Sequence, residues 1–323
     1  MNFFKPILFF AAATQIISCS TQTKTMAKQK TNAEISVKEG GSWNGKKYEG
    51  GSFKNVQSMS LDPRHTDHSF DIRFEGPGWE SNKVGYRLYL DWRNAIDIFG
   101  KKTEKMVLPE IGLDGFESYH LPQDWGSDIL KVGKGQGLGS LVRYENGEML
   151  RFDQVNSTKV EVKNSTKNSS VNINYEGWKT LNEQINLDTN FTIFPDERYT
   201  KVSFKTSNEI SGLCTGIVKV KKETPLIKKT SDNKKWSYMA TYANQSMFDN
   251  GLGMAVFYEN STVENVVDGP YDHLVKFKPT NKTVNYYFLA AWEKELNGIK
   301  TETEFINYLN LLLEKLNNSN ELK

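Results

Sequence analysis

The sequence predicts an all-β protein, built as one large β-supersandwich with a helix at its C-terminus. From Ser52 onward, short segments of alternating apolar and polar residues are separated by Gly, Asn, Asp and Pro, which is the pattern of antiparallel strands joined by turns. The chain has 323 residues, and a dozen or more such segments without an internal repeat exceed what an immunoglobulin-type sandwich of about 100 residues needs. We therefore expect two extended sheets.

The expected strands follow one another along most of the chain. One hairpin pairs residues 140–144 with 148–154 across Asn146-Gly147, a dipeptide that favours a tight β-turn. Further strands are expected at 69–74, 84–91, 159–163, 171–175, 184–194, 199–206, 217–222, 236–241, 253–258, 274–277 and 284–291.

The last segment has a different periodicity. Thr301 and Glu304 have the spacing of a capping box, and they precede apolar residues at helical spacing, namely Phe305, Leu309, Leu312 and Leu316. This pattern predicts a helix that packs its apolar stripe on the sandwich.

The N-terminus indicates export. Lys5 precedes an apolar run at 6–13, and Ile16-Ile17-Ser18-Cys19 follows it, which is typical of a bacterial lipoprotein signal, although an ordinary cleaved signal has a similar run. We interpret residues 1–18 as a signal peptide, Cys19 as the lipidated residue, 19–41 as a tether and 42–323 as a single catalytic domain. The expected location is periplasmic, with an anchor at Cys19, on the outer membrane. Cys214 is then a lone, buried, small apolar residue.

Charge and composition exclude several classes of partner. The formal net charge is +2, which gives no general attraction to nucleic acid, so an anionic partner must be selected by local arginines. Four histidines and two cysteines leave little material for metal or redox chemistry, and we expect neither a metal nor a cofactor. The His65-x-x-His68 spacing is weak evidence for a metal outside a helix.

The segment 84–101 combines charge with a strand pattern. Tyr86, Leu88 and Leu90 alternate with Arg87, Tyr89 and Asp91, and Arg93 and Asp97 follow. Such arginines and aspartates are costly to bury. Two interpretations remain open: the arginines receive an anion, or they form Arg–Asp pairs that close an edge of the sandwich.

The segment 119–139 is the second candidate site. This irregular, glycine-rich stretch contains six side chains suited to catalysis or ligand binding: His120, Asp124, Trp125, Asp128, Lys131 and Lys134. Histidine exchanges protons near neutrality, which makes His120 the best acid or base. His273, in a turn with Tyr271, is a possible spatial neighbour. The glycines lack the following helix that a dinucleotide site requires.

Four segments resemble the family known as domain of unknown function 4861: residues 74–81 (FEGPGWES), 85–101 (GYRLYLDWRNAIDIFGK), 119–133 (YHLPQDWGSDILKVG) and 288–293 (FLAAWE). The resemblance implies a β-supersandwich of the galactose-mutarotase type and a role in polysaccharide utilisation. It also implies an activity, the dehydration of oligosaccharides during breakdown of the anionic polysaccharide ulvan. There, water is removed from a non-reducing-end uronic acid to leave an unsaturated uronate.

This chemistry, applied to the matching segments, assigns roles. The carboxylate needs a cation, since charge builds there as C5 loses its proton, and Arg87 or Arg93 suits it. A base and an acid complete the reaction, with His120 as base and Tyr271 or His273 as acid. The remaining residues are assigned to substrate binding: Trp125 and Trp292 by stacking, Lys131 and Lys134 on anionic groups, and Asp124 beside them.

Other functions remain open at this stage. A polysaccharide lyase that cleaves the glycosidic bond by β-elimination uses the same groups. A hydrolase or mutarotase can use the same fold, because fold alone does not determine chemistry. A carbohydrate-binding lipoprotein without catalysis is the further alternative.

Overall fold

The computed structural model describes Met1, residues 29–230 and residues 234–323. The expected signal peptide, the lipidation site Cys19 and tether residues 19–28 lie outside the described residues. Within the described part of the chain, no helix has both the length and the apolar character needed to cross a membrane.

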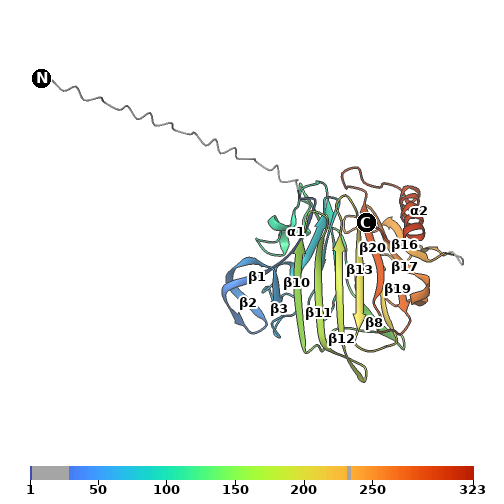
Figure 1. The fold of residues 1–323 in the computed structure, drawn as a ribbon, viewed down its shortest axis with the longest axis horizontal. Coiled ribbons are helices and arrows are strands. Elements are labelled where there is room, and N and C mark those ends of the chain that lie inside the picture. The colour runs from blue at the N-terminus through green and yellow to red at the C-terminus, as the bar shows by residue number, and fades with distance from the viewer. Residues whose placement is uncertain (2–28, 231–233) are drawn as a thin grey trace.

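The largest element is a nine-stranded antiparallel sheet, which faces the viewer in Figure 1. Its strands, in spatial order, are β15 (Ile227–Lys229), β16 (Trp236–Asn244), β17 (Gly251–Glu259), β20 (Val284–Trp292), β13 (Tyr199–Thr206), β12 (Glu183–Ile193), β11 (Ser169–Thr180), β10 (Ser157–Asn164) and β3 (Ser58–Ser60).

Two smaller antiparallel sheets complete the β structure. The six-stranded sheet has the order β2 (Lys47–Val56), β1 (Thr31–Asn44), β4 (Gly78–Ser81), β5 (Val84–Leu88), β6 (Ile96–Lys101) and β7 (Gly126–Asp128). The five-stranded sheet has the order β18 (Val263–Asp268), β19 (Asp272–Phe277), β14 (Leu213–Val218), β8 (Val142–Glu145) and β9 (Glu148–Leu150).

The main core lies between the nine-stranded sheet and the two smaller sheets. Trp79 of β4 stacks on Phe191 of β12, with ring centroids 5.1 Å apart. Tyr86 of β5 meets the edge of Phe288 of β20, also at 5.1 Å. Ile217 of β14 is buried in the same cluster. Since each sheet contributes alternate residues to one shared core, the predicted all-β supersandwich is confirmed. The expected second extended sheet is instead divided into two, of six and five strands.

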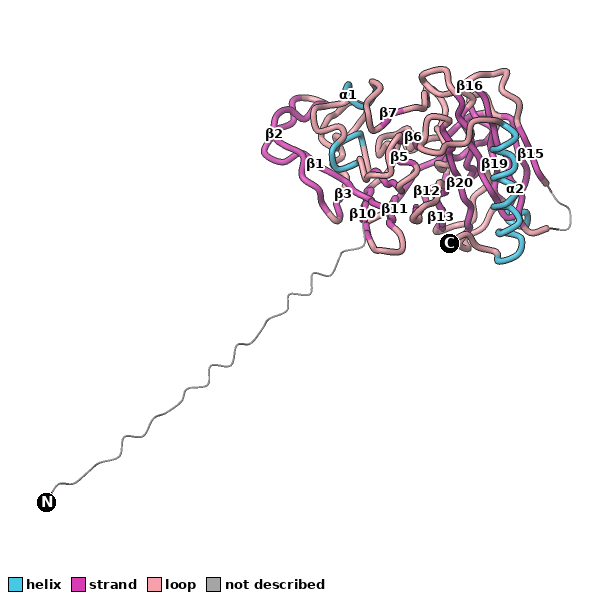
Figure 2. Tube along the Cα trace, turned by 90° about the horizontal axis from the view of Figure 1, so that it is seen from above, coloured by secondary structure: helices cyan, strands magenta, loops and turns pink. Residues whose placement is uncertain are grey.

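The helix α2 (Glu302–Ser319) covers the other face of the nine-stranded sheet. The Thr301 hydroxyl accepts a hydrogen bond from the backbone N–H of Glu304, and the Glu304 carboxylate accepts from the backbone N–H of Thr301, which makes a complete capping box. Phe305 and Leu309 are buried against the sheet, in a cluster with Tyr287. The predicted C-terminal helix is therefore confirmed. Figure 2 places α2 at the end of the molecule opposite β2 and the short helix α1 (Glu117–His120).

Several local predictions are confirmed. The hairpin across Asn146-Gly147 is the connection between β8 and β9. Cys214 is buried in β14 and is free, and burial raises the pKa of its thiol well above the ordinary value.

Others are wrong. Residues 31–41, assigned by the sequence to the tether, form the first part of β1, because β4 pairs with Thr31 and its neighbours and buries them. Residues 69–74 do not form a strand: the chain turns through the short 3₁₀ helix η1 (Arg73–Glu75), and Phe74 and Glu75 have φ angles of 41° and 67°. The strand expected at 217–222 begins earlier, at Leu213.

The packing of α2 is testable with two leucines of the same helix. Leu309→Ala should lower the free energy of unfolding by about 2–5 kcal/mol, because Leu309 is fully buried and truncation leaves a cavity. Leu311→Ala should change it by no more than about 0.5 kcal/mol, because Leu311 is 61% exposed. The change in helix propensity is the same for both, so chemical denaturation measures the packing alone. Equal losses would contradict the docking of α2 on the sheet.

Candidate active site

Strand alternation places a set of charged side chains outside the main core. In β5 and β6, Tyr86, Leu88 and Ile98 enter the core, so Arg87 and Asp97, which are paired in register, point to the opposite face of the six-stranded sheet. The segment between β6 and β7 covers this face, with a small apolar cluster that includes Phe99 and Tyr119. Polar groups beneath this cover are shielded from water.

Arg87 is the centre of a buried network. Its Nη1 donates to the Tyr119 hydroxyl at 2.8 Å, and its Nη2 donates to Tyr89 Oη at 3.1 Å, Asp97 Oδ2 at 2.8 Å and Asp128 Oδ2 at 2.6 Å. Tyr89 also donates to Asp97 at 2.6 Å. His120 adds its Nε2 at 3.3 Å from Asp128 Oδ2. We call Arg87, Tyr89, Asp97, Tyr119, His120 and Asp128 the arginine cluster.

The charges of the arginine cluster do not balance without His120. One guanidinium faces two carboxylates, and all three groups are about 2% exposed. Burial, followed by repulsion from Asp128, raises the pKa of Asp97 to about 7. The hydrogen bond to Asp128 raises the pKa of His120, and a hydrogen bond to the Phe116 carbonyl also raises it. Burial lowers this pKa but has a smaller effect than the hydrogen bond to Asp128. The raised pKa favours the charged form of His120, which offsets the second carboxylate. His120 is also the most exposed member, with 37% of its side chain accessible.

The predicted role of Arg87 as a ligand for a substrate carboxylate does not fit this geometry. Its two terminal nitrogens are already bonded to carboxylates and phenols, and its side chain is 2% exposed. A second anion would have to displace a buried carboxylate, which is strongly unfavourable. Arg87 is a positioning residue.

Arg93 occupies a different environment beside the arginine cluster. Its guanidinium lies over the Tyr89 ring at 4.2 Å and pairs with Asp91. It also contacts Glu75 at 3.0 Å and Asp67 at 2.9 Å. Its side chain is 18% exposed. Each arginine therefore has its own aspartate partner, Asp97 for Arg87 and Asp91 for Arg93, as the Arg–Asp interpretation predicted.

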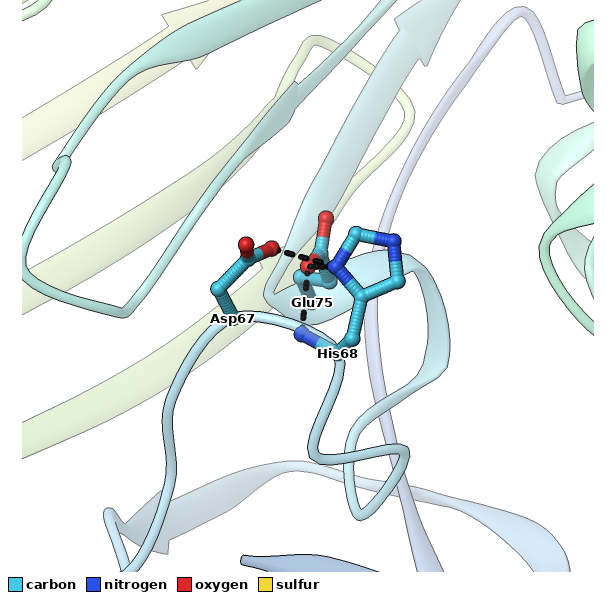
Figure 3. Close-up of side chains that lie close together, drawn as sticks. All are labelled: Asp67, His68 and Glu75. Carbon is cyan, nitrogen blue, oxygen red and sulfur yellow. Dashed lines mark hydrogen bonds and ion pairs between the residues drawn. The ribbon is translucent and has the colours of Figure 1, made fainter.

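Asp67, His68 and Glu75 form the group with potential metal ligands (Figure 3). His68 Nδ1 lies 2.6 Å from Asp67, and its backbone N–H donates to Glu75 at 3.1 Å. However, Arg93 already contacts both carboxylates, and a metal ion would have to compete with this cation. His65 does not join the group, since it pairs with Asp71 at 2.8 Å. We assign no metal to these residues.

A pocket of about 620 Å³ lies next to Arg93. It is lined by three cationic side chains, Arg93, Lys134 and Arg151, and by the aromatic rings of Trp92 and Tyr271; we call these five residues the basic pocket. Arg151 lies over the Trp92 ring at 5.5 Å and donates to the Arg93 carbonyl at 3.1 Å. The Lys134 ammonium lies 5.8 Å from the Tyr271 ring. Cations and aromatic faces together suit an anionic ring-shaped ligand.

The structure brings together some of the predicted residues and separates others. Arg93, Lys134 and Tyr271 meet in the basic pocket, whereas His120 belongs to the arginine cluster. His273 lies in β19 and contacts Asp268 at 2.9 Å, so the expected meeting of His273 with His120 is wrong.

Four residues predicted to bind substrate lie elsewhere. Trp292 is 5% exposed and donates to Asn250, which leaves no free ring face for stacking. Trp125 packs on Phe99 at 6.0 Å. Asp124 and Lys131 are exposed and do not line the basic pocket.

Sequence reasoning missed four members of the two groups. No site role was predicted for Tyr89 and Tyr119, which are members of the arginine cluster. None was predicted for Trp92 and Arg151, which line the basic pocket. The available signal was weak: Tyr89 shares the strand face of Arg87, and Trp92 precedes Arg93 directly. Their grouping depends on contacts between distant segments, such as Arg151 with Lys134, which are 17 residues apart.

Comparison with known proteins identifies the family. The family model described as "Domain of unknown function (DUF4861)" matches residues 10–321, so the chain belongs to this family and the resemblance is confirmed. The comparison with curated proteins gives no match. Among solved structures, one similar chain is a "Putative kojibiose phosphorylase from human microbiome", with a TM-score of 0.38 and 11% identity. The similarity covers 72% of this chain and 32% of that protein, so the chain spans about a third of that protein's length.

The positioning role of Arg87 predicts a large stability effect. Arg87→Met should lower the free energy of unfolding by about 3–5 kcal/mol, because it leaves two buried carboxylates without their cation. Arg64→Met is the matched control, since Arg64 pairs with Asp62 on the surface, where such pairs contribute little. Denaturant unfolding monitored by tryptophan fluorescence compares the two. A fully stable Arg87→Met variant would contradict the account.

The raised pKa of Asp97 predicts a pH dependence of stability. In the unfolded chain this carboxyl ionises near 3.8, and in the folded protein near 7, so rising pH across this window favours unfolding. Asp97→Asn cannot ionise. Its stability relative to wild type should therefore increase from pH 4 toward pH 8, as measured by thermal unfolding at each pH. A constant difference between the two proteins would show that Asp97 does not titrate in this way.

Proposed function

We propose that this member of the family is a carbon–oxygen lyase that removes water from the non-reducing-end uronic acid of an anionic, ulvan-type oligosaccharide. The observation that carries the proposal is that Arg93 contacts both the basic pocket and the arginine cluster. This side chain lines the basic pocket and also lies against Tyr89 of the arginine cluster. An anion-binding site is thereby joined to groups that titrate near neutrality, which is what elimination next to a carboxylate requires.

In this proposal the basic pocket binds the uronate carboxylate. Negative charge builds on the carboxylate as the C5 proton leaves, and Arg93, Lys134 and Arg151 stabilise that charge. The Nε and Nη2 atoms of Arg93 are already bonded to Asp91 and Glu75, so its Nη1, for which the described residues offer no hydrogen bond, is the donor available to the ligand. Trp92, which is 44% exposed, offers a face on which the sugar ring can pack.

The acid and base roles change relative to the sequence-based assignment. His120 contacts Asp128 in the arginine cluster and does not line the basic pocket, so it serves as a positioning residue through Asp128 and Arg87. Tyr271 is 42% exposed in the basic pocket beside the Lys134 ammonium, and it suits the base. Solvent supplies the proton for the leaving hydroxyl.

The proposed step is balanced in atoms and electrons. The Tyr271 phenolate oxygen takes the C5 proton, the C5–H electron pair forms the C4–C5 double bond, and the C4–O bond breaks. The departing hydroxyl takes a proton from solvent and leaves as water. Solvent then removes the proton from Tyr271.

The same groups suit a second candidate reaction. A polysaccharide lyase would expel a sugar from C4 instead of water and would shorten the chain. A non-catalytic carbohydrate-binding protein would use the basic pocket alone.

We also propose, from the N-terminal pattern with Cys19, that the protein acts in the periplasm as a lipid-anchored protein. Metabolic labelling with a radioactive fatty acid tests this proposal.

The direct test is mass spectrometry of uronate-ended oligosaccharides before and after incubation with the purified protein. Dehydration predicts a product one water lighter, with ultraviolet absorption from the new double bond. Chain shortening without loss of water would identify the lyase instead. Binding without any product would leave only the carbohydrate-binding alternative.

Two variants test the assignment of groups. Arg93→Met should reduce kcat/KM by at least about a hundredfold, because charge at the carboxylate is no longer stabilised. Tyr271→Phe should abolish turnover while retaining substrate affinity, since it removes only the phenol oxygen of an exposed side chain. Lys159→Met, a change in an exposed residue of β10, is the control and should keep wild-type rates. Full activity in Tyr271→Phe would exclude Tyr271 as base.

A further inference from the structure

A second cavity adjoins the basic pocket at Trp92. Its volume is about 270 Å³, and Trp92 lines both spaces. The cavity lies between the loop at 61–66, the segment 90–92 and the start of β10, with Phe152 and Tyr175 forming its aromatic wall. Because one side chain borders both spaces, ligands in the two would be direct neighbours.

The two spaces differ in charge. The basic pocket is lined by three cationic side chains and one carboxylate, Glu148. Among the described residues that line the second cavity, none is a lysine or an arginine, and its charged side chains are the carboxylates Asp62, Asp91 and Asp153. Asp62 is paired with Arg64 and Asp91 with Arg93. An anionic sugar therefore finds no free cation in this cavity, and Asp153 adds repulsion.

The polar groups of the second cavity suit hydroxyl groups instead. Asn156, Ser157 and Thr158 line it. The Asn156 amide and the Thr158 hydroxyl can donate and accept, whereas the Ser157 hydroxyl is bonded to Glu176. The rings of Trp92, Phe152 and Tyr175 supply apolar surface for the C–H face of a sugar. The charge and chemistry of this wall match a neutral, polyhydroxylated ring.

We propose that the second cavity is a subsite for a neutral sugar, adjacent to the uronate in the basic pocket, and that Trp92 separates the two sugars. This inference rests on the proposed function for the identity of the anionic residue. It makes the preferred ligand an oligosaccharide whose terminal uronate is linked to an uncharged sugar. Trp92 and Asn156 are then specificity-determining residues.

The test uses two ligands and calorimetry. Methyl glucuronide probes the basic pocket alone, and a disaccharide of glucuronic acid linked through C1 to a neutral hexose probes both spaces. Wild-type protein should bind the disaccharide at least about tenfold more tightly, which corresponds to about 1.4 kcal/mol. Asn156→Trp should fill the cavity and erase this gain, while its unchanged affinity for methyl glucuronide shows that the variant is folded.

Lys159→Trp is the matched control, because it adds the same bulk to an exposed position three residues along the chain and should keep the gain. The proposal is overturned if wild type shows no gain, if Asn156→Trp retains it, or if neither ligand binds. The outcome is separable from the proposed reaction: tight binding of the disaccharide without an unsaturated product would contradict only the dehydration.

Discussion

The buried guanidinium of Arg87 is the interaction on which the site depends. Arginine does not lose its proton in a protein, so a fully buried arginine must be surrounded by acceptors. Asp97 and Asp128 supply charge, and Tyr89 and Tyr119 supply hydroxyl oxygens. These contacts tie β5, β6, β7 and α1 together on the outer face of the six-stranded sheet. They also leave a surplus carboxylate, which explains why His120 is held close to Asp128 and favours its charged form.

Because the terminal nitrogens of Arg87 are all occupied, the proposed function assigns anion binding to Arg93. Both arginines lie on one segment, but the chain leaves the strand after Leu88 and turns at Asp91, where Arg93 pairs back to Asp91 over only two residues. This turn carries Trp92 to the surface and places Arg93 at the edge of the basic pocket. In the proposed function, Arg87 therefore fixes the arrangement of the titratable groups, and Arg93 contacts the ligand.

Local patterns predicted much of the fold, and only part of the site. The alternation at 84–91 correctly separated the core residues Tyr86 and Leu88 from Arg87, and the capping box at Thr301 correctly began α2, because both depend on neighbours within a few residues. The local sequence could not decide whether Arg87 binds an anion or pairs with an aspartate. The partners of Arg87 include Asp128, 41 residues away across an irregular segment, and no periodicity encodes that contact. The prediction for Trp292 was wrong for a related reason, since its burial depends on the packing of β20 against Gly100 of β6, in another sheet.

The most direct test of the proposed carboxylate site is a crystal structure of the protein soaked with glucuronic acid. We expect the carboxylate in the basic pocket, within hydrogen-bond distance of Arg93 or Arg151, with the contacts of Arg87 to Asp97 and Asp128 unchanged. A carboxylate bound to Arg87, with either aspartate displaced from it, would contradict the proposed site.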